Sequence, residues 1–208
     1  MPFSPHAVVT DESALERLYG TPTVASVTKV TRRLTPSYRA LIEASPFFVL
    51  ATSGPAGLDC SPRGDAPGFV RVHDDETLLV PDRRGNNRLD SLRNVVRDPR
   101  VALLFLVPGA DETLRVNGRA IVSADAALCD TFAVGGRVPR TVLVVAVDAV
   151  FFQCARALVR GGLWDPARHV ARESLPSTGT MLAEASEGRE GGEAYDRGLA
   201  ERIRTTLY

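Results

Sequence analysis

Lysine is almost absent from this sequence, since Lys29 is the only lysine among the 25 Lys and Arg residues of the 208-residue chain. A P-loop and a Schiff-base site each need a lysine within a recognisable motif, so the sequence excludes both kinds of site. Any tight binding of an anion must therefore use arginine guanidinium groups or backbone N–H groups.

Cysteine is also scarce, with Cys60, Cys129 and Cys154 as the only three. An odd number at wide spacing fits neither a disulfide framework nor a zinc site. We expect all three thiols to be reduced, and Cys154 to be buried as a small apolar residue.

Long apolar runs and an excess of charge of one sign are missing as well. The first residues lack the cationic and apolar parts of a signal peptide, and no segment has transmembrane length, which predicts a cytoplasmic protein. Acidic and basic residues balance at 25 each, so we expect neither a nucleic acid nor a membrane as partner.

Catalytic motifs are few. The chain contains no Gly-x-Ser-x-Gly and no Gly-x-Gly-x-x-Gly, and no cysteine has a histidine close by in the sequence. Asp165, His169 and Glu173 have helical spacing, but surface ion pairing explains such a trio better than a metal site, so we predict no metal. An enzyme of this composition needs a bound cofactor to carry its chemistry.

The runs of apolar and β-branched residues predict six or seven antiparallel strands in a mainly β fold with flanking helices (α+β), arranged as a small split β-barrel. The expected strands are 47–52, 58–61, 69–72, 77–80, 101–107, 113–123 and 141–153, the last with a bend near Asp148. Strand 101–107 is apolar throughout, so we expect it to be central and covered on both faces. The expected helices are 12–18, 37–44, 87–96 and 195–205, with an extended segment before Arg33 and a mobile linker at 187–193. We expect one domain, with a helical arm (1–45), a barrel (46–165) and a helical C-terminal extension (166–208).

The segment 81–92 is where an apolar strand stops and an amphipathic helix begins, and it carries Arg83, Arg84 and Arg88. The N–H groups of a first helical turn have no partner within the helix, so arginines beside them would make a seat for a phosphate. The same residues are also typical of an ordinary turn and helix cap with solvated arginines. A second Arg- and Gly-containing loop, 61–68, favours the phosphate interpretation because it adds Arg63 before another short strand.

Four segments in this order resemble the pyridoxamine 5′-phosphate oxidase-like FMN-binding split barrels: Ser-Pro-Arg-Gly-Asp (61–65), Arg-Arg-Gly-Asn-Asn-Arg (83–88), Asp-Pro-Arg-Val-Ala-Leu-Leu-Phe (98–105) and Glu-Thr-Leu-Arg-Val-Asn-Gly-Arg-Ala (112–120). The resemblance covers residues 46–164. It implies a homodimer that holds two FMN molecules at the subunit interface.

The resemblance also implies a set of cofactor-binding positions: Arg63, Asp82, Arg83, Asn86, Asn87, Arg88, Glu112, Thr113 and Trp164. Arg88 takes the place of the family's phosphate-binding lysine, and Arg63 would make a second contact to the phosphate or the ribityl chain. Asp82 and Arg83 would end the strand that passes the flavin ring, and Glu112 or Thr113 would match the region that supplies a polar contact from the other subunit. Trp164 would match an aromatic residue late in the family's chain.

The function that the resemblance implies is that of an FMN-dependent oxidoreductase. Its small-molecule substrate is unidentified, its electron donor would be NAD(P)H or another reductant, and its catalytic residues are unassigned. The Arg-rich C-terminal segment of the true oxidases has no match in residues 200–208, which argues against vitamin B6 as the substrate. The alternative is a carrier that binds flavin, deazaflavin or haem without turnover.

Overall fold

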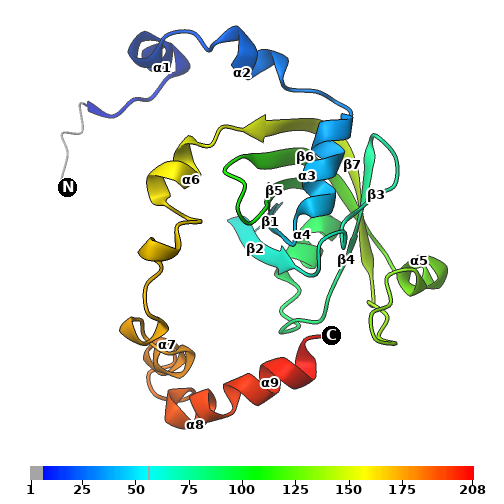
Figure 1. Cartoon of the computed structure of the whole chain (residues 1–208), viewed down its shortest axis with the longest axis vertical. Helices are drawn as coiled ribbons and strands as arrows, with labels where there is room; N and C mark the ends of the chain where they lie inside the picture. The colour runs from blue at the N-terminus through cyan, green and yellow to red at the C-terminus, as the bar shows by residue number, and fades with distance from the viewer. Residues whose placement is uncertain (1–6, 56) are drawn as a thin grey trace.

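A single antiparallel sheet forms the body of the protein (Figure 1). The computed structural model describes residues 7–55 and 57–208. The strands run in the order β2-β1-β5-β6-β7-β4-β3. Their bounds are β1 Phe47–Gly54, β2 Gly57–Gly64, β3 Arg71–Val72, β4 Thr77–Pro81, β5 Arg100–Leu106, β6 Thr113–Ser123 and β7 Val142–Gln153.

Helices precede, interrupt and follow the sheet. Their bounds are α1 Glu12–Tyr19, α2 Val24–Thr28, α3 Pro36–Ala44, α4 Asp90–Arg97, α5 Ala126–Asp130, α6 Arg156–Gly161, α7 Thr178–Ala185, α8 Gly192–Arg197 and α9 Leu199–Thr206, with 3₁₀ turns at Pro166–Arg168 and Arg172–Ser174. Helix α3 packs on β3, β6 and β7, and α4 packs on β1, β2 and β6. The expected split barrel is confirmed, and the sheet is not closed because β2 and β3 are both edge strands.

The core lies on the concave side of this sheet because the strands alternate buried and less buried residues. On β1 and β5 the inward positions include Phe48, Leu50, Leu103 and Phe105, all fully buried. The Phe48 and Phe105 rings have centroids 5.0 Å apart. The prediction that β5 is central is confirmed, because β1 and β6 pair with it on its two sides. Its outer face is not covered within the chain, since Leu104 there is only half-buried.

The predicted bend near Asp148 is confirmed as a β-bulge. The pairing of β6 with β7 runs from Asn117 opposite Ala149 to Gly118 opposite Val147, so Asp148 is the extra residue. A Cβ added to Gly118 would lie 2.1 Å from the Ala146 carbonyl oxygen. The bulge therefore requires glycine at position 118.

Several predicted boundaries were wrong for local reasons. The loop expected at 61–68 is strand as far as Gly64, because the edge strand β2 tolerates Pro62, whose missing N–H costs no ladder bond there. The short helix α2 occupies part of the segment expected to be extended, and the helix expected over 195–205 is divided at Gly198 into α8 and α9. The linker expected at 187–193 does join two helices, α7 and α8, although Gly192 already belongs to α8. The sequence Gly-Pro-Ala-Gly at 54–57 also predicts a turn, of which residue 56 lies outside the described residues.

Two further expectations about single side chains were wrong. Cys154 is exposed, because it follows the last residue of β7, where the strand leaves the sheet. Asp165, His169 and Glu173 do not share a helix, since two separate 3₁₀ turns divide this segment.

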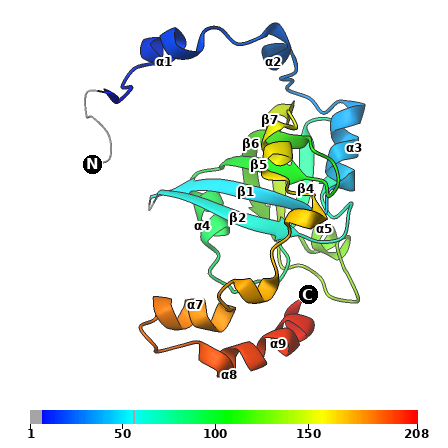
Figure 2. The ribbon, with the colours of Figure 1, turned by 60° about the vertical axis from the view of Figure 1, so that its left-hand side comes forward.

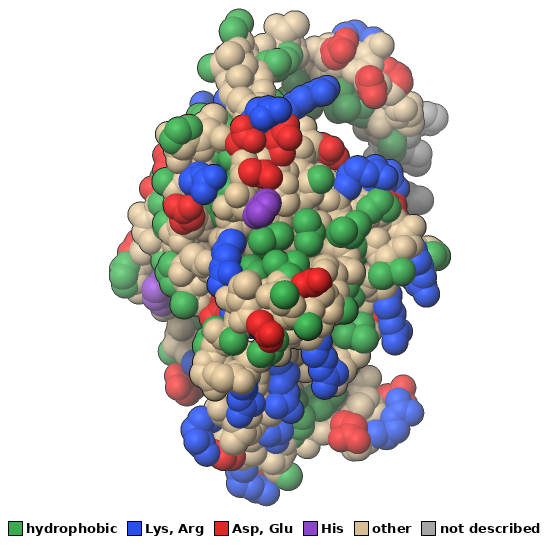
Figure 3. Space-filling model, turned by 90° about the vertical axis from the view of Figure 1, so that its right-hand side faces the viewer, with side chains coloured by type: hydrophobic (Ala, Val, Ile, Leu, Met, Phe, Trp, Pro, Cys, Tyr) green, Lys and Arg blue, Asp and Glu red, His purple; other side chains and the backbone are tan. Residues whose placement is uncertain are grey.

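The chain leaves the barrel at both ends. Figure 2 shows α1 and α2 extending from one end of the barrel, and α7, α8 and α9 forming a layer at the other. In Figure 3 basic side chains gather at the lower end of the molecule, at the level where Figure 1 shows α8 and α9. None of the described helices has the length and apolarity that a membrane span requires.

Candidate functional site

The edge strand β2 lies beside the segment that leads into α4. Ser91, in the first turn of α4, donates a hydrogen bond of 2.7 Å to Asp59 on β2, and Ser61 donates one of 3.1 Å to the same carboxylate. Asp59, Ser61 and Arg63 alternate along β2 and are its less exposed residues, so they share the inward face. The structure therefore places Asp59, near one end of β2, beside the start of α4, and Arg63, near the other end of β2, close enough to Asp82 for their charges to interact.

Asp82 lies where β4 ends, close to Arg63. Burial raises the pKa of the Asp82 carboxyl group, and the positive charge of Arg63 partly offsets this shift. The Asp82 N–H donates to the Thr141 carbonyl oxygen at 2.9 Å, and the buried Thr141 hydroxyl has no hydrogen-bond partner among the described residues.

The Arg83 side chain is largely buried, in contrast to the side chains of the neighbouring arginines. Its Nε lies 2.6 Å from Oδ2 of Asp65, and its Nη1 donates to the Phe132 carbonyl oxygen at 2.7 Å. The side chains of Arg83 and Asp65 are 15% and 4% exposed. The Arg83 guanidinium therefore links two loops. Fewer of its N–H donors remain free to bind a cofactor than the sequence suggested.

The remaining arginines of this segment face solvent. Arg84 and Arg88 are exposed, and Arg88 pairs with Asp90 through a contact of 2.8 Å. Arg63 donates only to the neighbouring Pro62 carbonyl oxygen in the described residues. A guanidinium has five N–H donors, so Arg63, Arg84 and Arg88 retain the capacity to bind a phosphate.

The predicted helix start was displaced. Helix α4 begins at Asp90, so Asn86, Asn87 and Arg88 lie in the preceding loop. Asn87 and Leu89 have φ values of 59° and 61°, which turn the chain sharply before the helix, and Asn86 accepts a hydrogen bond from the Arg88 N–H at 3.1 Å. The Asp90 carboxylate adds a negative charge at the helix terminus, so an anion here must compete with Asp90 for Arg88.

Glu112, Thr113 and Trp164 form a separate group. Thr113 begins β6 and is buried, Glu112 before it is exposed, and the Trp164 indole donates to the Ala110 carbonyl oxygen at 2.8 Å. The register pairs Ser123, at the far end of β6, with Val142, which pairs with Pro81. Ten residues of strand span about 33 Å, so one chain does not bring this group to Asp82.

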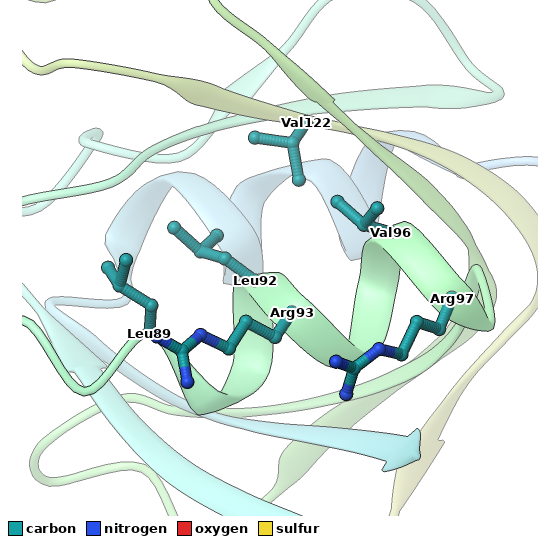
Figure 4. Close-up of a pocket in the computed structure, with 6 residues that line it drawn as sticks. All are labelled: Leu89, Leu92, Arg93, Val96, Arg97 and Val122. Atoms are coloured by element: carbon teal, nitrogen blue, oxygen red, sulfur yellow. The ribbon is translucent and has the colours of Figure 1, made fainter. Parts of the chain in front are cut away.

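Two hollows on the surface were not predicted. The first, of about 230 Å³, lies over α4 and β6. Figure 4 shows Leu92, Val96 and Val122 pointing toward one another, with Arg93 and Arg97 extending side by side along the rim. The amphipathic pattern of the helix is visible in the sequence. The sequence does not show that β6 lies beside this helix and completes the groove.

The second hollow, of about 190 Å³, lies beside the Asp65–Arg83 pair and is also lined by Phe69, Arg71 and Phe132. The Arg71 guanidinium lies 3.9 Å from the centroid of the Phe132 ring and donates to Thr131. The sequence reasoning missed this hollow because its walls come from segments far apart in the chain.

Within the described residues no group of three or more His, Cys, Asp or Glu side chains could hold a metal ion. Arg63 on β2 and Arg84 and Arg88 in the loop before α4 are arginines that could bind an anionic ligand. The chemistry that these side chains offer is anion binding by guanidinium groups.

Comparison with known proteins gives a family. A model of the family described as pyridoxamine 5′-phosphate oxidase matches residues 34–154. No curated protein matches the sequence.

Solved structures match at low identity. HupZ of Group A Streptococcus is 18% identical, with 57% of this chain and 93% of that chain covered and a TM-score of 0.47. A Clostridium acetobutylicum protein related to general stress protein 26 is 15% identical, with 56% and 85% covered and a TM-score of 0.45. An F420 reductase is 21% identical, with 56% and 98% covered and a TM-score of 0.42. Since the family model alone spans more than half of the chain, the protein belongs to the pyridoxamine 5′-phosphate oxidase family.

Proposed function

We propose that the protein binds FMN and acts as an FMN-dependent oxidoreductase on a small molecule. The observation that carries the proposal is the cationic segment Arg63, Arg84 and Arg88 beside the half-buried Asp82, in a chain of the pyridoxamine 5′-phosphate oxidase family. Guanidinium groups bind phosphate through paired, charge-assisted hydrogen bonds, which suits the terminal phosphate of FMN.

The division of labour follows from the side chains present. The flavin would supply the redox chemistry, and the protein would supply binding and orientation. Arg63 and Arg88 would hold the phosphate, while Asn86 and Asn87 offer amide groups to the ribityl chain. Asp82 would lie beside the ring, where a carboxyl group with a raised pKa is more readily protonated and can donate a hydrogen bond.

A second copy of the chain would complete the site. Glu112, Thr113 and Trp164 lie about a strand length away from Asp82 within one chain, so they can contribute to its site only from a partner subunit. The outer faces of β1 and β5 present paired apolar residues that are not fully buried: Phe47 opposite Leu106, Val49 opposite Leu104, and Ala51 opposite Ala102. We propose that this patch forms the centre of a homodimer interface.

The test of cofactor binding is the uptake of added FMN by the purified chain, measured by equilibrium dialysis and by visible absorbance. We expect saturable binding that approaches one FMN per chain. No flavin absorbance in the purified protein together with no uptake of added FMN would overturn the proposal.

Turnover separates an enzyme from a carrier. With FMN bound, an oxidoreductase should be reduced anaerobically by NAD(P)H or by a reduced deazaflavin at a rate that saturates with donor concentration. A carrier of flavin, deazaflavin or haem would bind its cofactor without such a rate. Haem or deazaflavin bound more tightly than FMN in the same dialysis would count against FMN as the cofactor.

A further inference from the structure

The helix α1 is amphipathic, and its apolar face is open to solvent. Neither α1 nor α2 has a buried residue, and both extend away from the barrel (Figures 1 and 2). Leu15, Leu18 and Tyr19 lie at i, i+3 and i+4, so they share one face of α1, and their exposed fractions are 47%, 67% and 83%. An exposed apolar face of this kind favours a partner surface that covers it.

Two glutamates border the apolar face of α1. Glu12 and Glu16 are four residues apart, so they form a row along the helix, about 90° round the axis from the centre of the apolar face. Arg17, the basic residue of the last turn, lies on the opposite side of the helix. The exposed side of α1 is therefore an apolar strip with negative charge along one edge.

The groove over α4 and β6, which we call the α4–β6 groove, has the complementary pattern. Leu92, Val96 and Val122 form its apolar floor, and Val96 is 75% exposed. Arg93 and Arg97, also four residues apart, line its rim (Figure 4). No ion pair among the described residues involves either of these arginines or either glutamate of α1. The charges of both surfaces are thus available to each other.

The two patterns fit together in one orientation. Each charged row lies on the same side of its apolar face when the helix is viewed from its N-terminus, since Arg93 follows Leu92 in α4 as Glu16 follows Leu15 in α1. Two such helices that face each other bring their charged rows to one edge only when they are antiparallel. The helix ends of opposite polarity then also adjoin, which the helix dipoles favour.

The N-terminal arm is long enough to leave its own barrel. Thr31 is joined to Val150 on β7 by two backbone hydrogen bonds, of 3.0 and 2.8 Å. Between this bridge and α1, residues 20–30 contain only the five-residue helix α2, so α1 can lie about 25 Å from the bridge. No residue of α1 lines the α4–β6 groove of its own chain. The groove is therefore accessible to the arm of another copy.

We propose that α1 of one subunit docks antiparallel in the α4–β6 groove of a second copy of the chain. Its apolar face covers the groove floor, Glu12 pairs with Arg97, and Glu16 pairs with Arg93. One helix of eight residues covers too little surface to hold two chains together by itself, so the inference rests on the homodimer proposed above. It does not depend on FMN, because no residue proposed to bind FMN takes part.

The test is disulfide crosslinking between two chains that carry different engineered cysteines. The antiparallel arrangement places Leu15 beside Val96, so one chain carries Leu15→Cys and the other, enlarged by a tag, carries Val96→Cys. Both positions are exposed. The exposed thiols Cys60 and Cys154 are replaced by serine in every chain, and Cys129 is buried. The two chains are co-expressed and oxidised without FMN, and a disulfide between chains of different size joins two copies.

A matched control distinguishes docking from random collision. Arg17→Cys replaces Leu15→Cys in the control, because Arg17 lies on the opposite side of the same helix. We expect Leu15→Cys to give at least about tenfold more crosslinked product with Val96→Cys than Arg17→Cys does, because docking raises the effective concentration of one thiol at the other. Gel electrophoresis without reductant measures the product.

Charge reversal tests the two proposed ion pairs. Arg93→Glu together with Arg97→Glu in the chain that carries Val96→Cys should lower the yield severalfold, because like charges then meet along the edge of the groove. Adding Glu12→Arg and Glu16→Arg to the other chain should restore the yield. A reversal without effect, or one that the second reversal does not restore, would overturn the proposed pairs and with them the antiparallel docking.

Three further outcomes would contradict the proposal. Equal yields from Leu15→Cys and Arg17→Cys would overturn the docking. A chain that carries both Leu15→Cys and Val96→Cys, if it forms only an internal disulfide, would show that α1 binds its own groove. Sedimentation velocity of the same mixtures separates the two proposals: a dimer without selective crosslinking overturns the docking alone, whereas a monomer overturns the homodimer and the docking together.

Discussion

Arginines that lie close together in this sequence have different roles in the structure. Arg83 is held by Asp65 and the Phe132 carbonyl oxygen, whereas Arg63, Arg84 and Arg88 keep donors for a ligand. The sequence predicted a cationic segment. It could not predict which guanidinium is hydrogen-bonded within the protein, because Asp65 and Phe132 are 18 and 49 positions away from Arg83.

The proposed phosphate contact predicts a difference between two arginines of the same region. Arg88→Ala should weaken FMN binding roughly ten- to a hundredfold, since a hydrogen bond to a charged group contributes about 1.5–3 kcal/mol. Arg97→Ala is the control, because Arg97 lies at the other end of α4 and lines the groove of Figure 4. Equilibrium dialysis measures FMN binding by both variants. A larger loss of affinity from Arg97→Ala would indicate that the phosphate binds at that groove.

The Asp65–Arg83 pair predicts a difference in stability between two ion pairs. Removing one partner of a buried pair leaves an uncompensated charge, so Arg83→Ala should lower the free energy of unfolding by about 3 kcal/mol. Arg100 forms a solvent-exposed pair with Asp98, and Arg100→Ala should change it by less than about 1 kcal/mol. Urea unfolding measures the free energy of unfolding of both variants. Equal losses of stability would show that Arg83 does not form a buried pair with Asp65.

At the scale of elements, strands were easier to predict than the ends of helices. Runs of apolar and β-branched residues placed all seven strands, because such residues favour extended chain and each strand buries at least one face. The start of α4 was missed by three residues, because Leu89 adopts the left-handed conformation that a sequence pattern assigns to glycine or asparagine. The short helix α2 was missed because its sequence, Val-Ala-Ser-Val-Thr, is rich in β-branched residues.

The bulge between β6 and β7 predicts a sensitive position in the sheet. Gly118→Ala should lower the free energy of unfolding by about 1–3 kcal/mol, because the new Cβ would clash with the Ala146 carbonyl and shift the β7 backbone. Gly161→Ala, at the end of α6, is the control, since a Cβ there meets no atom within 4 Å. Urea unfolding measures the free energy of unfolding of both variants. If Gly118→Ala left it unchanged, the register shift between β6 and β7 would lie elsewhere.

At the scale of the whole molecule, one chain holds two halves of the proposed site at opposite ends of β6. Sequence resemblance could name Glu112, Thr113 and Trp164 beside Asp82, but only the strand register reveals how far apart they lie. The split barrel has a filled core, so we propose that FMN binds on its outside, where a second subunit would cover the ring. The patch on β1 and β5 is the apolar surface that we propose for that subunit.

The most direct measurement of this account is sedimentation velocity across a dilution series, with and without FMN, for the full chain and for Leu104→Arg. Leu104 lies at the centre of the proposed interface patch, and a charge there should disfavour association. The account predicts a dimer of the full chain that FMN stabilises against dilution, because a ligand that binds only the dimer shifts association by mass action. It also predicts that Leu104→Arg is monomeric and loses FMN. A monomer that retains one FMN per chain would contradict the shared site and, with it, the central claim.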